Sequence, residues 1–278
     1  MKKNYLYNKT VVITGASGGL GFAIAKLLIE KYDCKIIGIA RNEKKMLNSI
    51  DTLGNKKDNF SYYLFDVSKR ENWQDFTQKL QDNNFKIDIL INNAGFMLPF
   101  EKFEYTTDAQ IDSIVQTNFM ANVYSIKSLM PLLKKSSSPA IVNICSSAGL
   151  LAVVGQSMYS ATKHAIHGLT ETLIQEYKGK IYIGGIYPGF IKTDIMSGLS
   201  LDDKSKKLVN KFMMPVDKAS KKIVKAIRKK KKKYVLGFDG KFMGCFGRIF
   251  PKTTTSIITK VLKSSKLEMF ANTFDYEK

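Results

Sequence analysis

The alternation of short apolar runs with longer amphipathic segments is what most constrains the fold of this chain. Six runs rich in β-branched and other apolar residues lie at 10–14, 34–40, 60–66, 87–92, 140–145 and 181–187. Helical patterns separate them, most clearly at 20–32, 107–133 and 156–177. Because strands connected through helices pair in parallel, this order predicts an α/β fold in which helices cover both faces of a doubly wound parallel sheet. Such sheets bind ligands beyond the carboxyl ends of their strands.

The chain of 278 residues is expected to form one domain, because no linker-like stretch and no internal repeat divides it. Its three cysteines, Cys34, Cys145 and Cys245, are far apart and odd in number, which predicts no disulfide framework and fits a reducing compartment. No metal site is predicted, and the two histidines, His164 and His167, are interpreted as packing or surface residues. The first ten residues are polar, and no apolar run reaches the roughly 20 residues that span a bilayer, so we expect a cytoplasmic location.

Basic residues are concentrated at the end of the chain. Lys and Arg number 44 against 24 Asp and Glu, a net charge of +20, and residues 215–278 hold 17 basic and 5 acidic residues. Such a balance can serve nucleic acid, an anionic membrane surface or anionic small molecules. Nucleic-acid binding through this basic end would need aromatic stacking platforms or a recognised motif, and neither is found there, so no nucleic-acid partner is predicted.

The same end of the chain carries apolar segments. Residues 218–233 predict a helix that ends in the lysine-rich run 228–233, and the apolar stretch 242–251 follows. An amphipathic stripe comes next, formed by Ile257, Ile258, Val261 and Leu262. Cations beside such segments are typical of peripheral binding to an anionic membrane, at the inner face in this case. The alternative is a solvated face with a helical subunit or lid contact.

A glycine-rich turn follows the first predicted strand and runs into the first predicted helix. It consists of Thr14, Gly15, Ala16, Ser17, Gly18, Gly19, Leu20 and Gly21. Glycines let the backbone turn tightly and approach a pyrophosphate, which the free N–H groups and the positive end of the helix dipole stabilise. The turn alone is weak support, because tight strand-to-helix turns use glycine anyway. Its spacing is TGxxxGxG and not the G-x-G-x-x-G of the dinucleotide fingerprint.

A serine, a tyrosine and a lysine form the group with the clearest chemistry. Tyr159 and Lys163 are four residues apart in the predicted helix 156–177, so both side chains lie on one face, and Ser146 precedes the tyrosine by thirteen residues. Free tyrosine has a pKa near 10, and a nearby ammonium favours the phenolate. We therefore expect Lys163 to lower the pKa of Tyr159 and make it a proton donor for carbonyl reduction.

Three further motifs complete a pattern that resembles the short-chain dehydrogenase/reductase family in order and spacing. They are Asn92-Asn93-Ala94-Gly95 after the fourth strand, Asn118 in the following helix, and Pro188-Gly189 with Thr193 after the sixth strand. The resemblance covers about residues 8–195. It implies a one-domain Rossmann-type fold, a nicotinamide cofactor, and interconversion of a carbonyl compound and an alcohol.

The resemblance also implies catalytic roles. Tyr159 would donate a proton to the carbonyl oxygen, or remove it in the reverse direction, and Ser146 would hydrogen-bond the same oxygen. Lys163 would also hold the nicotinamide ribose. Asn118 would anchor a water that relays protons from Lys163 to solvent. Ser147 offers an adjacent hydroxyl, but Ser146 has the family's spacing to Tyr159.

Cofactor-binding residues follow from the same resemblance. Asp66 and Val67 would border the adenine ring, and Thr193 would hydrogen-bond the nicotinamide carboxamide. For the Asx and Gly residues after strands, the alternative is that they only make turns. The whole predicted cofactor site comprises Thr14, Gly15, Ser17, Gly18, Gly19, Leu20, Gly21, Arg41, Asp66, Val67, Asn93, Ala94, Gly95, Tyr159, Lys163, Pro188, Gly189 and Thr193.

The end of the second strand predicts which nicotinamide cofactor is preferred. A carboxylate there would bond the ribose hydroxyls and repel a 2′-phosphate, whereas an arginine would attract it. The strand ends in Ala40 and Arg41, with no acidic residue at this place. NADP(H) is therefore predicted over NAD(H), which stays possible: Arg41 could be merely a solvated charge, and the family's other basic position is the neutral Gly18.

The segments after the core are expected to set the substrate. In the family the residues corresponding to 194–215 close the substrate pocket, and Leu208, Val209, Phe212 and Met213 form an apolar stripe there that suits a lid or an ordinary amphipathic helix. Residues 216–278 form a variable basic portion. We predict reduction of a ketone or aldehyde, or the reverse, on an apolar lipid, steroid or acyl derivative. The alternative is a catalytically weak NADP(H)-binding sensor, and the resemblance implies a homo-oligomer.

Overall fold

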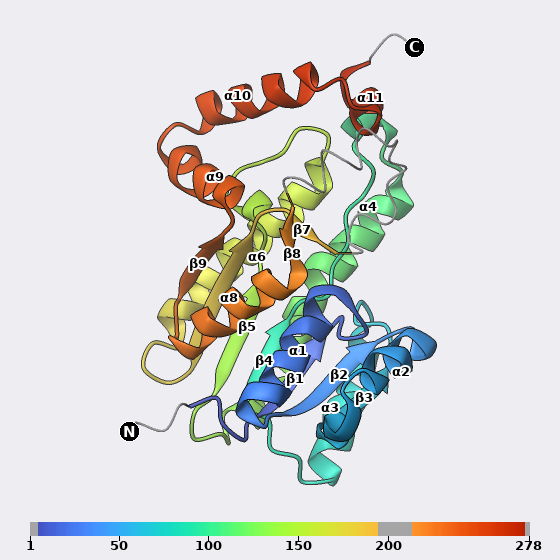
Figure 1. Ribbon diagram of the computed structural model, residues 1–278, viewed down its shortest axis with the longest axis vertical. Helices are drawn as coiled ribbons and strands as arrows, with labels where there is room; N and C mark the ends of the chain where they lie inside the picture. Colours follow the sequence, from blue (N-terminus) through green and yellow to red (C-terminus); the bar gives the residue numbers. More distant parts are fainter. Residues whose placement is uncertain (1–4, 194–212, 276–278) are drawn as a thin grey trace.

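A seven-stranded parallel sheet is the centre of the computed structural model, which describes residues 5–193 and 213–275 (Figure 1). The strand order is β3-β2-β1-β4-β5-β6-β9, and every neighbouring pair is parallel. The strands are β1 (Thr10–Thr14), β2 (Lys35–Ala40), β3 (Phe60–Leu64), β4 (Ile89–Asn92), β5 (Ala140–Ile144), β6 (Tyr182–Pro188) and β9 (Lys233–Leu236). This arrangement confirms the predicted single-domain, doubly wound α/β fold.

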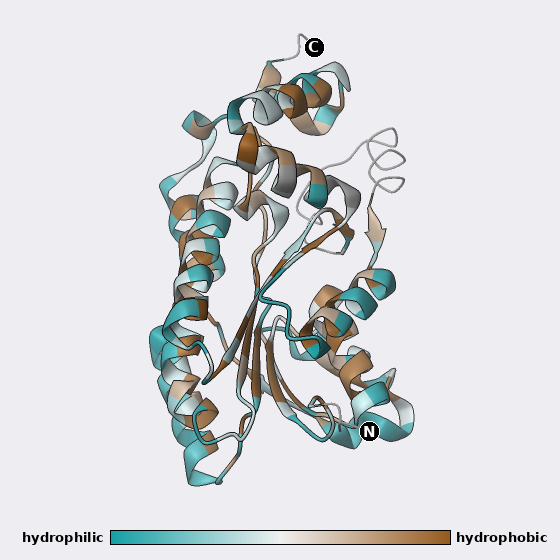
Figure 2. Cartoon of the chain, turned by 90° about the vertical axis from the view of Figure 1, so that its left-hand side faces the viewer, coloured by the Kyte–Doolittle hydropathy of each residue, from teal (hydrophilic) through white to brown (hydrophobic). Residues whose placement is uncertain are grey.

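Helices cover both faces of the sheet. On the faces lie α1 (Gly19–Tyr32), α2 (Glu43–Asp51), α3 (Arg70–Asp82), α5 (Ala121–Leu133), α6 (Ser157–Glu176) and α8 (Val216–Arg228). The other helices are α4 (Asp108–Val115), α9 (Phe238–Ile249), α10 (Pro251–Ser264) and α11 (Ala271–Phe274), of which the last three lie at one end of the molecule (Figure 1). A separate short ladder pairs β7 (Ile191–Lys192) with β8 (Met214–Pro215). In Figure 2 the mostly brown strands lie between helices whose outer faces are largely teal. No helix in the described parts of the chain has the length and apolar character needed to cross a bilayer.

The two faces have separate cores because successive strand residues point to opposite sides of the sheet. On β1, Val11 and Ile13 join the core under α1, α2 and α8, whereas Val12 joins the core under α3, α5 and α6. Trp73 of α3 is fully buried on the second face, and its indole nitrogen donates to the Val67 carbonyl at 2.9 Å. Burial on both faces is why these strands are continuously apolar in sequence.

Two helix predictions need correction. The predicted helix 107–133 is interrupted by a π-helical turn at Gln116–Met120 between α4 and α5. The predicted helix 218–233 ends at Arg228, because Lys229 caps it and Lys230 adopts a positive φ of 50°. The chain then forms β9, whose Leu236 is buried against the sheet, so a lysine-rich run that reads as the end of a helix leads into the seventh strand.

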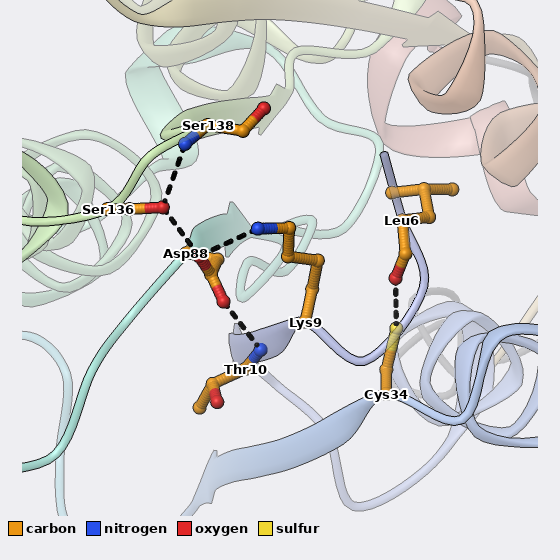
Figure 3. A network of polar contacts seen from close by, with 7 residues as sticks. All are labelled: Leu6, Lys9, Thr10, Cys34, Asp88, Ser136 and Ser138. Atoms are coloured by element: carbon orange, nitrogen blue, oxygen red, sulfur yellow. Dashed lines mark hydrogen bonds and ion pairs between the residues drawn. The ribbon is translucent and has the colours of Figure 1, made fainter. Parts of the chain in front are cut away.

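The amino edge of the sheet is fastened by a polar network around Asp88 (Figure 3). The Asp88 carboxylate accepts from Lys9 Nζ at 3.1 Å, from the Thr10 backbone N–H at 3.1 Å and from the Ser136 hydroxyl. The Ser138 backbone N–H donates in turn to the Ser136 Oγ. These contacts join the starts of β1 and β4 to the chain entering β5, at the edge opposite the strands' carboxyl ends.

Candidate active site

A cavity of about 460 Å³ lies at the carboxyl edge of the sheet. Most of the residues predicted for the site line it, from the loops after β1, β2, β3, β4, β5 and β6 and from α6. The predicted residues along its wall are Gly15, Ser17, Gly18, Gly19, Leu20, Arg41, Asp66, Val67, Asn93, Ala94, Gly95, Ser146, Tyr159, Lys163, Pro188, Gly189 and Thr193. Thr14, Gly21 and Asn118 do not line the cavity; they lie directly behind the residues that do.

Close backbone packing explains the glycines after β1. Gly15 has a φ of +65°, and a Cβ there would lie 3.0 Å from Asn93 Nδ2. At Gly21 a Cβ would lie 2.3 Å from the Gly15 carbonyl oxygen, so no side chain fits while α1 starts at this place. The turn therefore brings bare backbone and the N-terminal end of α1 to the cavity, an arrangement that suits the pyrophosphate of a dinucleotide.

Thr14 and Asn93 hold this turn against the loop after β4. The Thr14 Oγ1 accepts from the backbone N–H groups of Asn93 and Ala94, both at 2.9 Å. The Asn93 Nδ2 donates back to the Thr14 carbonyl at 3.0 Å and to the Gly15 carbonyl at 3.3 Å. Thr14 thus acts as a brace between two loops of the cavity.

Two cationic side chains border the cavity beyond β2. Arg41 stands at the end of the strand, and Lys45 of α2 reaches the glycine-rich turn: a Cβ at Gly18 would lie 2.7 Å from Lys45 Cε. Burial raises the pKa of Asp66, but hydrogen bonds from Ser68 and the charge of Arg41 outweigh this, so the net pKa is below its usual value. No spacing in the sequence predicts a role for Lys45 at this site, because only the fold brings α2 beside Gly18.

Ser146, Tyr159 and Lys163 meet at the centre of the cavity. The Ser146 hydroxyl hydrogen-bonds the Tyr159 phenol, and the Lys163 Nζ lies 5.6 Å from the centre of the tyrosine ring. Lys163 Nζ also donates to the Ile144 carbonyl at the end of β5, at 3.2 Å. Ser146 is held at a φ of +70°, a region that costs a non-glycine residue about 1–3 kcal/mol. The surrounding structure therefore holds the serine in a backbone conformation that a serine rarely adopts.

The pKa directions at this centre differ from the sequence-based expectation. Burial raises the pKa of Tyr159, and the hydrogen bond from Ser146 offsets only part of this rise. Burial also lowers the pKa of Lys163 to about 8. The expected lowering of the tyrosine pKa by the lysine is therefore not observed, because both side chains are more than nine-tenths buried, where their charged forms are disfavoured. Tyr159 is a protonated phenol at neutral pH.

Asn118 positions the loop after β4 from within the π-helical turn. Its Oδ1 accepts from the Phe96 backbone N–H and its Nδ2 donates to the Phe96 carbonyl, both at 2.9 Å. A Cβ at Gly95 would lie 3.0 Å from Asn118 Oδ1 and 3.4 Å from Lys163 Nζ, so Gly95 lets the amide and the ammonium come close. The π turn rotates the buried Asn118 into this place.

The other end of the cavity is apolar. Its walls include Phe96, Met97, Phe100, Val153 and Met243, the last from α9. The C-terminal arm supports this wall from behind. The Phe270 ring meets the Phe100 ring edge to face at 4.9 Å between centroids, and the Asn272 carbonyl accepts from the Lys102 backbone N–H. Residues 267–274 thus help to shape the apolar end of the cavity.

Gln156 adds a polar atom to this apolar end. The side chain is 3 % exposed and lines the cavity, and its Nε2 donates to the carbonyls of Leu98 at 2.8 Å and Pro99 at 3.1 Å. Its Oε1 is buried and has no hydrogen-bond partner among the described residues. A buried acceptor without a partner is costly, so this oxygen is a candidate for a ligand donor. Its place as the first residue of the predicted helix 156–177 was the only sequence signal.

Other predicted features lie beside or outside this site. His164 Nδ1 contacts the Ser160 carbonyl and His167 Nδ1 contacts the Tyr187 hydroxyl, as packing residues do. No group of three or more His, Cys, Asp or Glu side chains is placed to hold a metal in the portion that the structure covers. Of the predicted lid stripe, Met213 lines the cavity, whereas Leu208, Val209 and Phe212 lie outside the described residues.

Comparison with known proteins accounts for this arrangement. A family model described as short chain dehydrogenase matches residues 9–204. An uncharacterised oxidoreductase of Staphylococcus aureus is 33% identical over 202 residues, which cover 72% of this chain and 86% of the relative. The chain belongs to the short-chain dehydrogenase/reductase family. It is an oxidoreductase of a family that binds NAD(P)(H) and acts on small molecules.

Two further relatives of this short-chain dehydrogenase/reductase extend the comparison. A 3-oxoacyl-[acyl-carrier-protein] reductase of Chlamydia pneumoniae is 33% identical over 197 residues, covering 70% of this chain and 78% of the relative. The crystal structure of a short-chain dehydrogenase from Streptomyces avermitilis covers 92% of this chain and 97% of its own, with a TM-score of 0.74 and 23% identity. The structural match reaches beyond residues 9–204, so the fold likeness includes much of the C-terminal portion.

Proposed function

We propose that this short-chain dehydrogenase/reductase uses NADPH to reduce a ketone or aldehyde on an apolar molecule, and catalyses the reverse oxidation when product is in excess. One observation carries the proposal. The hydroxyls of Ser146 and Tyr159 and the ammonium of Lys163 line the same cavity as the glycine-rich turn. A proton donor, an orienting donor and a dinucleotide cradle are thus within reach of one bound substrate.

The cavity residues fit a nicotinamide dinucleotide. The backbone at Gly15 and Gly19 and the start of α1 would hold the pyrophosphate, and Asp66 with Val67 would border the adenine. At the other end, Lys163 would hold the nicotinamide ribose and Thr193 the carboxamide. Pro188, Gly189, Ala94 and Gly95 would line the path between them without adding bulk.

A preference for NADPH is supported by two cations. Arg41 and Lys45 both line the cavity beyond β2, where the 2′-phosphate of a bound NADP(H) would lie. Gly18 leaves room for the Lys45 chain, so the lysine from α2 brings positive charge to the place where the family's glycine loop has its own basic residue. NAD(H) lacks the 2′-phosphate that both cations would contact and is expected to bind more weakly.

The polar centre supports a proton-donor role for Tyr159. The bound nicotinamide would supply or accept the hydride. Tyr159, held protonated by burial, would give its proton to the carbonyl oxygen, and the Ser146 hydroxyl would hydrogen-bond the same oxygen and orient it. Lys163, with a pKa of about 8, can return a proton to Tyr159 near neutral pH. Asn118 would act as a positioning residue and, with an ordered water, would connect Lys163 to solvent.

The walls of the cavity support an apolar substrate. Phe96, Met97, Phe100 and Met243 offer aromatic and thioether surface, and methionines adapt to ligands of varied shape. The Gln156 Oε1 would accept from a hydroxyl or amide N–H of the substrate. Acyl derivatives, lipids and steroids combine such a polar group with an apolar body, and one relative is by its name a 3-oxoacyl-[acyl-carrier-protein] reductase.

The outer segments complete the proposal. Residues 194–215 would cover the substrate end, and the basic residues 216–278 form the variable portion of the single domain 1–278. The enzyme is expected to form a homo-oligomer through its long helices, as its family implies.

The proposal is tested by titrating the full chain with NADPH and with NADH and following reduced-nicotinamide fluorescence. A panel of ketones and aldehydes of increasing chain length is then added to the tighter complex. Tighter binding of NADPH and its consumption with a long-chain carbonyl are expected. Failure of both nucleotides to bind would refute the cofactor site, and binding without turnover on any carbonyl would favour the sensor alternative.

A further inference from the structure

Large apolar side chains are exposed on the two helices at one end of the molecule. Phe246, Ile249, Phe250, Ile257 and Val261, on α9, α10 and the junction between them, are each 47–65% exposed. Figure 1 places α9 and α10 at the end of the long axis that lies beyond the strands' carboxyl ends. We call these five residues the α9–α10 surface. So many exposed apolar side chains in one short segment mark an interaction site.

The opposite side of α9 packs against the rest of the protein, so the helix that exposes these side chains is held in place. A Cβ at Gly244 would lie 3.1 Å from Leu150 Cδ1, and one at Gly247 would lie 3.1 Å from Leu151 Cδ1. Met243, directly before Gly244, is 6% exposed and lines the active-site cavity. Two glycines thus bring α9 close to the loop after Ser146, and the aromatic side of the helix faces away.

The charge of the two helices indicates which kind of partner binds this surface. Residues 238–264, which span α9 and α10, contain five basic residues and one acidic residue, Asp239. Lys241, Lys252 and Lys260 are exposed on the two helices. A second copy of the chain would bring two such cationic sets together, which opposes pairing through this face. Cations around exposed aromatic and aliphatic side chains match the headgroup region of an anionic bilayer, which accepts both.

We propose that the α9–α10 surface docks the protein on an anionic lipid bilayer. The lysine-rich run 228–233 is not part of this contact. The Lys231 carbonyl accepts from the Tyr182 hydroxyl at the start of β6, whereas α9 follows the end of β9. The run therefore lies at the amino edge of the sheet and the α9–α10 surface beyond the carboxyl edge, which corrects the idea that both act together.

Docking through this surface orients the active site. Met243 lines the substrate end of the cavity from the inner side of α9, so the bilayer would lie next to that end. An apolar substrate dissolved in the bilayer would have a short path to the cavity. The docking itself rests on the exposed surface alone and does not depend on the proposed reductase activity, whereas this delivery of substrate does.

Vesicle flotation with the full chain tests the docking. Neutral phosphatidylcholine vesicles are compared with vesicles containing 30% phosphatidylglycerol. Binding to the anionic vesicles is expected, and Ile249→Gln with Val261→Gln should weaken it at least tenfold. Lys252→Gln with Lys260→Gln should weaken it roughly 30-fold, by removal of two cations near the lipid. The matched control, Lys229→Gln with Lys232→Gln, removes the same charge at the amino edge and should change binding less than twofold.

A fluorescence measurement separates docking from a merely structural role. Phe246→Trp should show a blue-shifted emission on anionic vesicles and quenching by brominated lipid. Phe85→Trp, an exposed position after α3 at the amino edge, should show neither. NADPH binding by each variant checks that it is folded.

Three outcomes would overturn the inference. They are absence of wild-type binding to anionic vesicles, an equal loss from the Lys229/Lys232 control, and conversion of a dimer into a monomer by Ile249→Gln with Val261→Gln. Vesicle binding without carbonyl reduction would contradict the proposed function and leave the docking intact. Carbonyl reduction without vesicle binding would contradict the docking and leave the proposed function intact.

Discussion

The two edges of the sheet are built in opposite ways. At the amino edge, the Asp88 carboxylate is fully engaged by Lys9, Thr10 and Ser136. At the carboxyl edge, Ser146 combines a φ of 70° with a ψ of 153°, far from the left-handed helical values of 48° and 36° that Asp33 adopts at the amino edge, and the Gln156 Oε1 lacks a partner among the described residues. The amino edge satisfies its polar groups, whereas the carboxyl edge holds strained or unsatisfied groups around a cavity.

This difference teaches where stability and function are located in the molecule. Groups that are already satisfied add to the free energy of unfolding but have nothing left to offer a ligand. Groups held in a costly state lower that free energy and gain when a ligand binds. Substitutions at the amino edge should therefore lower stability and leave activity unchanged, whereas substitutions at the carboxyl edge should lower activity.

The largest expected effect is at the carboxyl edge. Tyr159→Phe removes the proton donor and should lower kcat for carbonyl reduction about 1000-fold, in the upper part of the range for general acids. Its Kd for NADPH should stay within a factor of about two, because the phenol contributes little to nucleotide binding. Stopped-flow turnover and fluorescence titration measure the two quantities. Tyr5→Phe, which removes a hydroxyl that donates to the Ile227 carbonyl, is the control and should leave kcat unchanged.

The next effect concerns the cations beyond β2. Arg41→Asp should favour NADH. The double variant Arg41→Ser with Lys45→Ser should lower the ratio of kcat/KM for NADPH to kcat/KM for NADH about 100-fold. The reason is that each charged contact to a phosphate contributes about 1.5–3 kcal/mol. Each single variant should give part of the change. Initial rates with both cofactors measure the ratio. A ratio that the double variant leaves unchanged would show that neither side chain reads the 2′-phosphate.

The amino edge should respond in stability alone. Asp88→Ala leaves Lys9 and the Thr10 N–H without their acceptor and should lower the free energy of unfolding by about 2 kcal/mol, roughly 30-fold in the folding equilibrium. Denaturant titration measures the loss. Well below the transition, kcat should equal that of the wild type. A loss of kcat in the folded variant would contradict the separation of the two edges.

The smallest expected effect is the pH response of Lys163. Burial lowers its pKa to about 8, so the ammonium is present below that pH and lost above it. The rate of carbonyl reduction should therefore fall as pH rises through about 8, approaching tenfold per pH unit. A profile of kcat/KM from pH 6 to 10 measures it, and a rate that stays flat to pH 10 would exclude the proton-supply role.

The same pKa has a consequence for stability with a definite sign. Between about pH 8 and the ordinary lysine pKa near 10.4, the unfolded chain binds a proton that the folded chain does not, so the free energy of unfolding rises with pH in this window. At neutral pH the buried charge is a cost. Lys163→Met should remove it and raise the free energy of unfolding at pH 7 by about 1–3 kcal/mol, while carbonyl reduction is lost.

The parts of the site that the sequence predicts are those with local causes. Tyr159 and Lys163 share a helix face because they are four residues apart, and the glycine-rich turn is short enough for its spacing to be read directly. The alternation of apolar runs determined the parallel sheet, since continuous apolar strands require cover on both faces. Each of these predictions depends on residues that are close together along the chain.

The tertiary structure decided what depends on distant segments. It brought Lys45 beside Gly18 and Phe270 behind Phe100, and the sum of burial around Tyr159 reversed the sign expected for its pKa. It also made residues 233–236 a strand, because pairing with β6 outweighed the helical pattern of the lysine-rich run. The sequence by itself therefore determined the sheet and the chemical identity of the site. The tertiary structure decided the electrostatics of the site, the shape of its substrate end and the separation of the basic run from the α9–α10 surface. The reason is that packing between distant segments sets burial and brings together residues that no spacing in the sequence connects.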